Sequence, residues 1–257
     1  MTRPAQEEAG TKNRENALLL GIDACGTTGS VALACVEQGE LRVLGEATLA
    51  SRECAAGLVP AIADLLRSAD RSIEMLRGVV VVHGPGSFTG IRVGVATAKG
   101  LVEPRGLPLI AVSRLDTLAR VAGADGAALD AWRGQMFVGM KTPDGWQERL
   151  VTAGEFTVAE DGLQMPETVA VCEESVAQLL ETVAEEVHLV RVTSPGAAQA
   201  LEAALERWLA GESDDAATLD GHYLRGSERG TERGPSRTSE APRPIADDAP
   251  GRSRMRP

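Results

Sequence analysis

The sequence predicts an α/β protein built from two similar lobes. Short apolar patterns typical of strands alternate with amphipathic patterns typical of helices along most of the chain. In each half, two strands joined by a tight turn precede crossover helices, so the second half repeats the order of the first. The chain has 257 residues and 43% hydrophobic content, which is enough to bury a sizeable core.

The first half begins with the strands ALLLGID and SVALACV, joined by the turn ACGTTG, and VLGEATLA is predicted to be a third strand. A helix follows, and we expect Pro60 to begin or kink it. The buried strand GVVVV comes next, and then a helix from Ser87, which is well placed as its N-cap. The apolar face of the first helix contains Leu58, Ile62, Leu65, Leu66 and Ala69.

The second half begins with the strand LPLIAV and a helix in SRLDTLARVA, where Ser113 and Asp116 resemble a capping signal. The strands AALD and QMFVGMK flank the turn AWRG. ETVAVC and EVHLVRV are further predicted strands, separated by the helix SVAQLLETVAEE. The helix GAAQALEAALERWLAG closes the globular part, because its leucines and Trp208 recur at helical spacing.

Composition divides the chain into four parts. Residues 1–16 form a polar leader, residues 17–107 the first lobe and residues 108–225 the second lobe. Residues 226–257 are rich in Pro, Gly, Arg and Ser and nearly lack large apolar residues, so they cannot bury enough surface to fold. We therefore expect a disordered leader and a disordered tail.

Composition also excludes several classes of protein. No stretch approaches the roughly 18 apolar residues that cross a bilayer, and the start of the chain has no secretory core, so we expect a cytoplasmic protein without membrane contact. The Cys and His residues show no metal-ligand spacing, so no metal site is expected. The net charge is −11, although the arginine-rich tail is positive. An acidic body repels a phosphate backbone, so strong RNA binding by the isolated chain is not expected.

The segment HGPGSFTG lies between the predicted strand GVVVV and a helix, where many proteins hold a phosphate. It is not a Walker loop, since the next lysine, Lys99, is three helical turns away. It is not a dinucleotide fingerprint either, because Ile110 stands where an acid would hold a ribose. Two interpretations remain: a structural turn capped by Ser87, or an anion site. The residues concerned are Gly84, Pro85, Gly86, Ser87, Phe88, Thr89 and Arg92.

The following helix has an unusual row of small residues. Gly90, Gly94 and Ala98 recur every fourth position, although glycine inside a helix costs roughly 1 kcal/mol against alanine. Close approach of another backbone would compensate for that cost. Ile91, Val95 and Leu101 on the adjoining face can bury into the lobe, so we expect the small ridge to be exposed and to receive a helix, from this chain or another.

The N-terminal hairpin GIDACGTTGSVALA resembles the phosphate-binding hairpin of the actin, Hsp70 and sugar kinase superfamily. In that superfamily a glycine follows two residues after the strand-ending aspartate. Here Asp23 is followed at that distance by Cys25, and Gly26 and Thr27 come one place late. The turn after Asp130 in the second half also lacks the expected glycine run. The resemblance implies a two-lobed actin-like (ASKHA, ribonuclease H-like) fold with a degenerate nucleotide site.

A longer segment, VVVVHGPGSFTGIRVGVATAKGLVEPRGLPLIAVSRLDTLA, strongly resembles the bacterial TsaB (YeaZ) family, and GPGSFTGIRVG is its most specific part. GIDACGTTGSVALA, ALDAWRGQMF and, more weakly, GHYLR extend the resemblance over about residues 17–225. Two features depart from it: Cys54 stands where a histidine is expected, and the leader and tail exceed the usual length.

The resemblance implies a non-catalytic accessory subunit for threonylcarbamoyladenosine synthesis on tRNA. It implies a homodimer when alone, pairing with a TsaD-like synthase through first-lobe helices, a further TsaE-like ATPase, and tRNA contact only through the complex. It implies no cofactor on the isolated chain, with ATP or ADP possible at the complex interface. The expected partner interface contains Leu58, Ile62, Leu65, Gly90, Gly94, Thr97 and Ala98.

Two other functions compete with this one. A small-molecule kinase or ATPase of the same superfamily would need nucleotide affinity in the free chain, and the displaced Gly26 argues against it. A peptidase would need a nucleophile and a base, but no Ser-His-Asp pattern or metal-ligand pair is visible, and His83 is more typical of a structural strand end. No catalytic residue is predicted.

Overall fold

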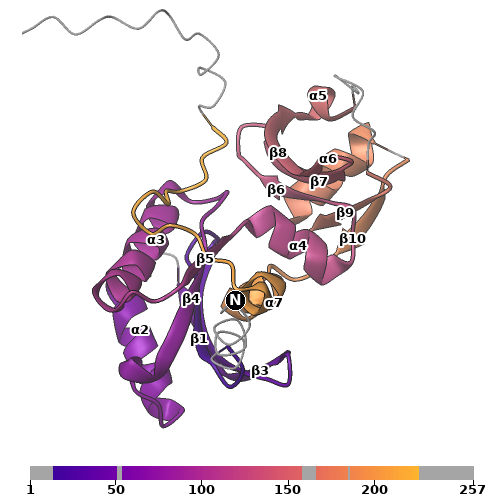
Figure 1. Ribbon diagram of the computed structural model, residues 1–257. Coiled ribbons are helices and arrows are strands. Elements are labelled where there is room, and N and C mark those ends of the chain that lie inside the picture. Colours follow the sequence, from indigo (N-terminus) through magenta and orange to yellow (C-terminus); the bar gives the residue numbers. More distant parts are fainter. Residues whose placement is uncertain (1–13, 51–53, 158–165, 185, 226–257) are drawn as a thin grey trace, which may run out of the picture. The chain divides into compact units, whose positions relative to one another are not determined.

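The computed structural model describes residues 14–50, 54–157, 166–184 and 186–225. The first lobe is built on a five-stranded sheet in the order β3-β2-β1-β4-β5 (Figure 1). β1, β2 and β3 are antiparallel neighbours, whereas β1, β4 and β5 run parallel. The strands are β1 (Leu18–Asp23), β2 (Thr28–Glu37), β3 (Glu40–Ala50), β4 (Leu76–Val82) and β5 (Leu109–Val112).

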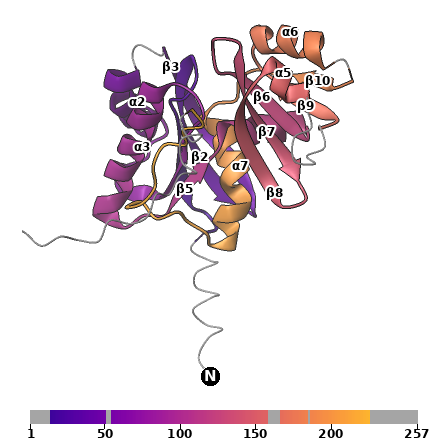
Figure 2. The ribbon, with the colours of Figure 1, turned by 90° about the horizontal axis from the view of Figure 1, so that it is seen from above.

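Helices cover both faces of this sheet. α2 (Cys54–Ser68) and α3 (Phe88–Val102) pack on one face, and α7 (Ala197–Ala210) packs on the other (Figures 1 and 2). β1 is therefore buried along its whole length, as its continuous apolar sequence LLLGID requires. α7 can approach the sheet closely because residue 78 is glycine. A Cβ at Gly78 would lie 2.5 Å from the Trp208 ring. Short 3-10 helices, Ile73–Met75 and Glu103–Arg105, follow α2 and α3.

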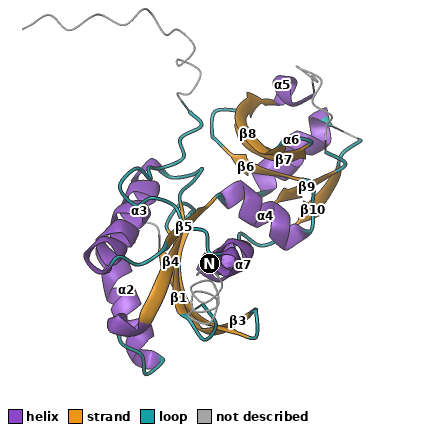
Figure 3. Cartoon of the chain, viewed as in Figure 1, coloured by secondary structure: helices purple, strands orange, loops and turns teal. Residues whose placement is uncertain are grey.

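The second lobe repeats this arrangement. Its sheet has the order β10-β9-β6-β7-β8, with β6, β7 and β8 antiparallel and β6, β9 and β10 parallel (Figure 3). α4 packs on one face and α6 on the other, each over its own apolar cluster. The elements are α4 (Arg114–Ala122), β6 (Gly126–Asp130), β7 (Gln135–Thr142), β8 (Gly145–Thr152), α5 (Ala153–Thr157), β9 (Thr168–Val171), α6 (Glu174–Val183) and β10 (His188–Arg191).

The prediction of two similar α/β lobes is confirmed, because both sheets share one strand order and one pattern of directions. The expected caps are also present. The Ser87 hydroxyl accepts a hydrogen bond from the Gly90 amide, and the Ser113 hydroxyl accepts from the amides of Leu115 and Asp116.

The expected division at residues 107 and 108 does not match the sheets. β5 pairs with β4, so the first lobe extends to Val112. α7 returns to the first sheet, because its apolar face, which includes Leu201 and Trp208, belongs to the first-lobe core. The expected leader is also too long, since the Arg14 guanidinium lies 4.7 Å from the Trp208 ring centroid. Residues 1–13 and 226–257 lie outside the described residues.

Two elements were not predicted. β8 contains Gln147, Glu148 and Arg149 in succession, which hides the alternation of an edge strand, and α5 is only five residues long. No helix in the described ranges combines the length and the apolar character that a membrane span requires.

Candidate functional site

The small ridge of α3 is buried, and the expectation that it is exposed is wrong. A Cβ at Gly90 would lie 1.8 Å from the Ala24 carbonyl oxygen, and one at Gly94 would contact the Ala24 and Val81 side chains. Ala98 is fully buried. The helix thus places its smallest side chains where it crosses the β1–β2 turn and the sheet of its own lobe. The close backbone approach inferred from the ridge is real, but it is internal.

The outer sides of α2 and α3 are the exposed ones. Leu58, Ile62 and Leu65 belong to the first-lobe core, so they do not form a free surface as expected. Thr97 is half-exposed. Val59 on α2 is 62% exposed, next in sequence to the core residue Leu58. The sequence signal for Val59 is its position off the apolar stripe. Other exposed small residues are Ala55, Ala56 and Ala63 on α2, and Ala96 and Gly100 on α3.

The HGPGSFTG loop packs against the β1–β2 turn. The Ser87 amide donates to the Cys25 carbonyl at 2.9 Å, and a Cβ at Gly86 would lie 2.3 Å from that oxygen. Gly84 has a φ of +127°, a conformation that favours glycine. Two of the loop's amides, those of Ser87 and Gly90, are therefore bonded within the chain. Pro85 is buried, whereas Phe88, Thr89 and Arg92 are exposed.

The β1–β2 hairpin, in which Gly26 comes one place later than in phosphate-binding hairpins, lies against Arg114. This arginine was not predicted from the sequence. The Arg114 side chain is 6% exposed and lies 3.6 Å from the Glu173 carboxylate. It also donates to the Ser194 hydroxyl at 3.3 Å, and a Cβ at Gly26 would lie 3.3 Å from Nη2 of Arg114. The chain's own guanidinium therefore occupies the space beside the hairpin, while Thr27 is exposed.

Asp23 ends β1 and is buried under the turn. Its carboxylate accepts a hydrogen bond from the Cys25 amide at 2.8 Å. Burial raises the pKa of Asp23, and the nearby charge of Arg114 and the Cys25 amide offset only part of that increase. Burial also raises the pKa of the Cys25 thiol well above its usual value, so this thiol is not an activated nucleophile.

A second polar cluster joins β8 to the start of α4 and to residue 222. His222 Nε2 lies 2.8 Å from a Glu148 carboxylate oxygen, and the rings of His83 and His222 stack with centroids 5.4 Å apart. The Ser113 hydroxyl and the Trp146 indole both donate to Glu148. Burial would raise the pKa of Glu148, but the hydrogen bonds from His222, Ser113 and Trp146 together hold it below its usual value. Burial and the neighbouring His222 lower the pKa of His83.

This cluster contains a serine, an acid and a histidine, but in an order unsuited to nucleophilic catalysis. A catalytic serine donates its proton to an imidazole. Here the Ser113 hydroxyl donates to the Glu148 carboxylate, and it already caps α4. The glutamate lies between serine and histidine, so the imidazole of His222 does not accept the proton of this serine.

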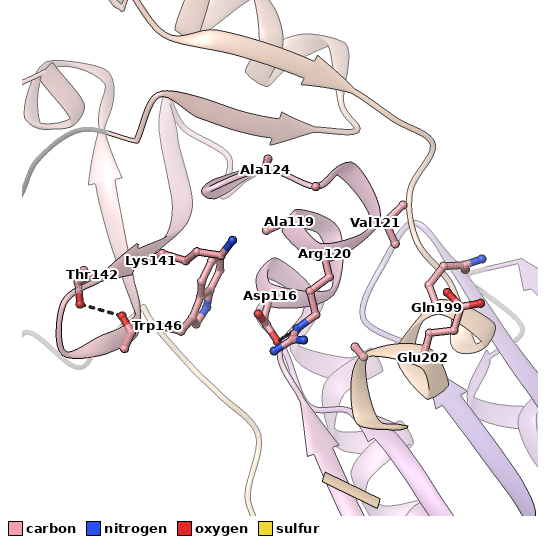
Figure 4. A pocket seen from close by; sticks show the side chains of 13 residues that line it. Asp116, Ala119, Arg120, Val121, Ala124, Lys141, Thr142, Trp146, Gln199 and Glu202 are labelled. Atoms are coloured by element: carbon pink, nitrogen blue, oxygen red, sulfur yellow. Dashed lines mark hydrogen bonds and ion pairs between the residues drawn. The ribbon is translucent and has the colours of Figure 1, made fainter. Parts of the chain in front are cut away.

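A larger cavity lies beside this cluster and shares Trp146 with it. It has a volume of about 750 Å³ and lies among α4, the β7–β8 hairpin and α7 (Figure 4). Its cationic groups are paired, Arg120 with Asp116 at 2.8 Å and Lys141 with Asp125 at 3.7 Å, while Glu202 also lines it. Among the described residues, no group of three or more potential metal ligands occurs. Among the described residues that line this cavity there is no Ser, Cys or His.

Comparison with known sequences gives consistent similarities. The family model described as TsaD, tRNA N6-adenosine threonylcarbamoyltransferase, matches residues 47–144. The tRNA threonylcarbamoyladenosine biosynthesis protein TsaB of Bacillus subtilis is 34% identical over 153 residues, which are 57% of this chain and 65% of that protein. TsaB of Escherichia coli is 34% identical over 125 residues, 46% of this chain and 52% of that protein. The chain thus matches less than two thirds of the length of these curated relatives.

Solved structures support the same assignment. A Pseudomonas aeruginosa protein described as similar to peptidase YEAZ has a TM-score of 0.66 and 26% identity, covering 81% of this chain and 100% of that one. YeaZ from the same organism has a TM-score of 0.63 and 24% identity over the same shares, which shows the fold. With its duplicated sheets, the chain is a two-lobed actin-like α/β protein. The TsaB sequence matches agree with this fold: the chain is similar to TsaB (YeaZ) proteins over part of their length.

Proposed function

We propose that this chain is a non-catalytic, cytoplasmic partner that binds and activates a TsaD-type synthase in the formation of threonylcarbamoyladenosine on tRNA. The names of the similar proteins support the pathway. The outer side of α2 and α3 supports the role of partner, because it exposes Val59 among small residues over which another helix can pack closely.

The proposed docking surface is the outer side of α2 and α3, centred on Val59. The two helices lie next to each other on the same face of the first sheet (Figures 1 and 2). Val59 is 62% exposed, and the exposed residues Ala55, Ala56 and Ala63 of the same helix are small, so another helix can approach closely. This surface replaces the small ridge as the expected interface. A homodimer in the absence of the synthase would use the same surface.

Two observations favour a non-catalytic role over the alternatives. A kinase or ATPase would need room for phosphates at the β1–β2 turn, and Arg114 is already paired with Glu173 beside that turn. A peptidase would need an activated nucleophile, and Ser113 donates to Glu148 rather than to an imidazole and caps α4. We further propose that a TsaE-like ATPase joins the pair, that ATP or ADP binds only at the joint with the synthase, and that tRNA binds through the complex.

The proposal is tested by mixing the chain with the TsaD-type synthase of its organism and separating complexes by size-exclusion chromatography. Val59→Asp places an unpaired charge in the centre of the proposed surface and is expected to abolish co-elution while the fold is retained. Val121→Asp is the matched control, since Val121 is also an exposed valine, 42% exposed, but lies on α4 of the second lobe. Co-elution of Val59→Asp at wild-type level would refute the docking surface.

A further inference from the structure

A small cavity beside the start of α3 differs from the rest of the molecule in its side chains. It has a volume of about 250 Å³ and lies among the HGPGSFTG loop, the β6–β7 turn and residues 222–225. The segment after α7 reaches this position because the His222 amide donates to the His83 carbonyl at 2.7 Å. We call this cavity the aromatic pocket; its lining includes Pro85, Phe88, Trp132, Phe137, Tyr223 and Arg225.

Two aromatic rings of the aromatic pocket face solvent. Phe88 and Trp132 are each 56% exposed, although the chain has only seven aromatic residues of the Phe, Trp and Tyr types. Trp132 and Arg133 both have a φ of +58°, a left-handed conformation that is unusual for large side chains. Asp130 holds this turn by accepting a hydrogen bond from the Trp132 amide at 2.6 Å. The fold thus accepts a disfavoured backbone that leaves an indole exposed, which is typical of functional sites.

Arginines interleave with these rings. The Arg92 guanidinium lies 4.0 Å from the Phe88 ring centroid and donates to the Tyr223 hydroxyl at 3.3 Å. Arg225 lines the pocket, and Arg133 follows Trp132 directly. Within the described ranges, none of these three arginines forms an ion pair.

The pocket is also locally free of negative charge. Its lining has no carboxylate, in a chain of net charge −11. The nearby acids are engaged elsewhere: the Asp130 carboxylate accepts from the Trp132 amide and the Ser175 hydroxyl, and Glu148 pairs with His222. A ligand at the pocket therefore meets aromatic faces and unpaired cations.

We propose that the aromatic pocket binds an unpaired base of single-stranded RNA, stacked on Trp132 and Phe88, with neighbouring phosphates on Arg92, Arg133 and Arg225. Aromatic platforms combined with arginines are how proteins hold unpaired bases. Several unpaired arginines around one small pocket fit a chain of phosphates better than the phosphate of one free nucleotide. The inference rests on the proposed function only for the identity of the RNA, which would be the tRNA substrate.

The first test uses tryptophan fluorescence of the isolated chain at low ionic strength, since its net charge weakens RNA binding. Titration with a short oligoadenylate is expected to quench Trp132, because Trp208 is buried and the half-buried Trp146 lies outside the aromatic pocket, bonded to Glu148. Trp132→Phe is expected to remove that quenching. Duplex RNA of equal length is expected not to quench. Equal quenching by the duplex would show charge attraction without stacking, and equal quenching by AMP would show a free-nucleotide site. Either result, or no quenching, would overturn the proposal.

The second test measures tRNA affinity of the mixed complex with the TsaD-type synthase. One stacked base contributes roughly 5- to 150-fold in affinity, so Trp132→Ala is expected to weaken binding within this range while Trp132→Phe retains most of it. The salt dependence is measured as the slope of log affinity against log salt concentration. Arg133→Gln is expected to reduce the magnitude of this slope by roughly 0.7. Lys141→Gln, on the distant β7–β8 hairpin, is the control and is expected to change neither value. Unchanged affinity in Trp132→Ala would refute the site.

The two proposals fail separately. Trp132 lies on the second lobe, away from α2 and the middle of α3, so Trp132→Ala is expected to co-elute with the synthase like the wild type. If the wild type does not co-elute but oligoadenylate still quenches Trp132, the proposed function is wrong and the RNA site stands. If the wild type co-elutes and every Trp132 variant binds tRNA normally, the RNA site is wrong and the proposed function stands.

Discussion

The packing of α3 makes a quantitative prediction at Gly90. An added Cβ would lie 1.8 Å from the carbonyl oxygen of Ala24. This backbone atom is held in place because the next residue, Cys25, is hydrogen-bonded to Ser87 and to Asp23. Alanine gains about 1 kcal/mol of helix propensity over glycine, whereas overpacking costs roughly 1–3 kcal/mol and sometimes more. Because this contact requires the helix or the turn to move, we expect Gly90→Ala to lower the free energy of unfolding by about 2 kcal/mol. For a domain of this size, that is a decrease of roughly 4–8 °C in Tm.

Two other glycines in α3 provide internal controls. A Cβ at Gly100 would meet nothing within 4 Å, so Gly100→Ala is expected to stabilise the chain by about 1 kcal/mol. At Gly94 the nearest atom would be 3.6 Å away, an ordinary contact, so Gly94→Ala is expected to be neutral or slightly stabilising. Urea titration and thermal unfolding of the three variants give the ranking. If Gly90→Ala is as stable as Gly100→Ala, the ridge does not pack on the β1–β2 turn and is free, as the sequence alone indicated.

Further predictions concern the buried charges. Arg114→Met leaves Glu173 without its cation and is expected to lower the free energy of unfolding by about 3 kcal/mol in urea titration. Calorimetry is expected to show no gain of ATP affinity in this variant. Unchanged stability would contradict the buried pair. The lowered pKa of His83 means that the unfolded chain binds a proton more readily, so stability is expected to fall as the pH decreases below about 6.5. The lowered pKa of Glu148 is expected to cause a second loss of stability below about pH 4.3. Glu148→Gln is expected to flatten that part of the curve of stability against pH. An unchanged curve would exclude the cluster as its cause.

Local sequence patterns predicted the elements and the duplicated architecture, because period and capping are local properties. The apolar stripe of α2 and the caps Ser87 and Ser113 follow from residue spacing alone. The repeated order of hairpin and crossover indicated two lobes before any contact was known. β8 was missed because its polar residues Glu148 and Trp146 are bound in a cluster that local pattern does not reveal.

The orientation of α3 required tertiary information. A helical pattern separates the small side, Gly90 and Gly94, from the large side, Ile91 and Val95, but it does not say which side meets the sheet. In the fold both are buried, since small residues fit over the β1–β2 turn and large ones fill the space beside it. The same limit applies to Arg114, Glu148 and His222, whose partners are distant in sequence.

The buried charges of this two-lobed architecture join segments that are distant in sequence. The space beside the β1–β2 turn contains Arg114, which contacts Glu173 and Ser194 of the chain itself. Glu148 adds contacts to Ser113 and His222, so the start of α4 is held from two sides. Such bonds fix one conformation before any ligand binds. Because the surface is then preorganised, it loses less conformational entropy on docking. The internal arginine therefore favours a constant scaffold, which is what the proposed docking of a partner on α2 and α3 would require.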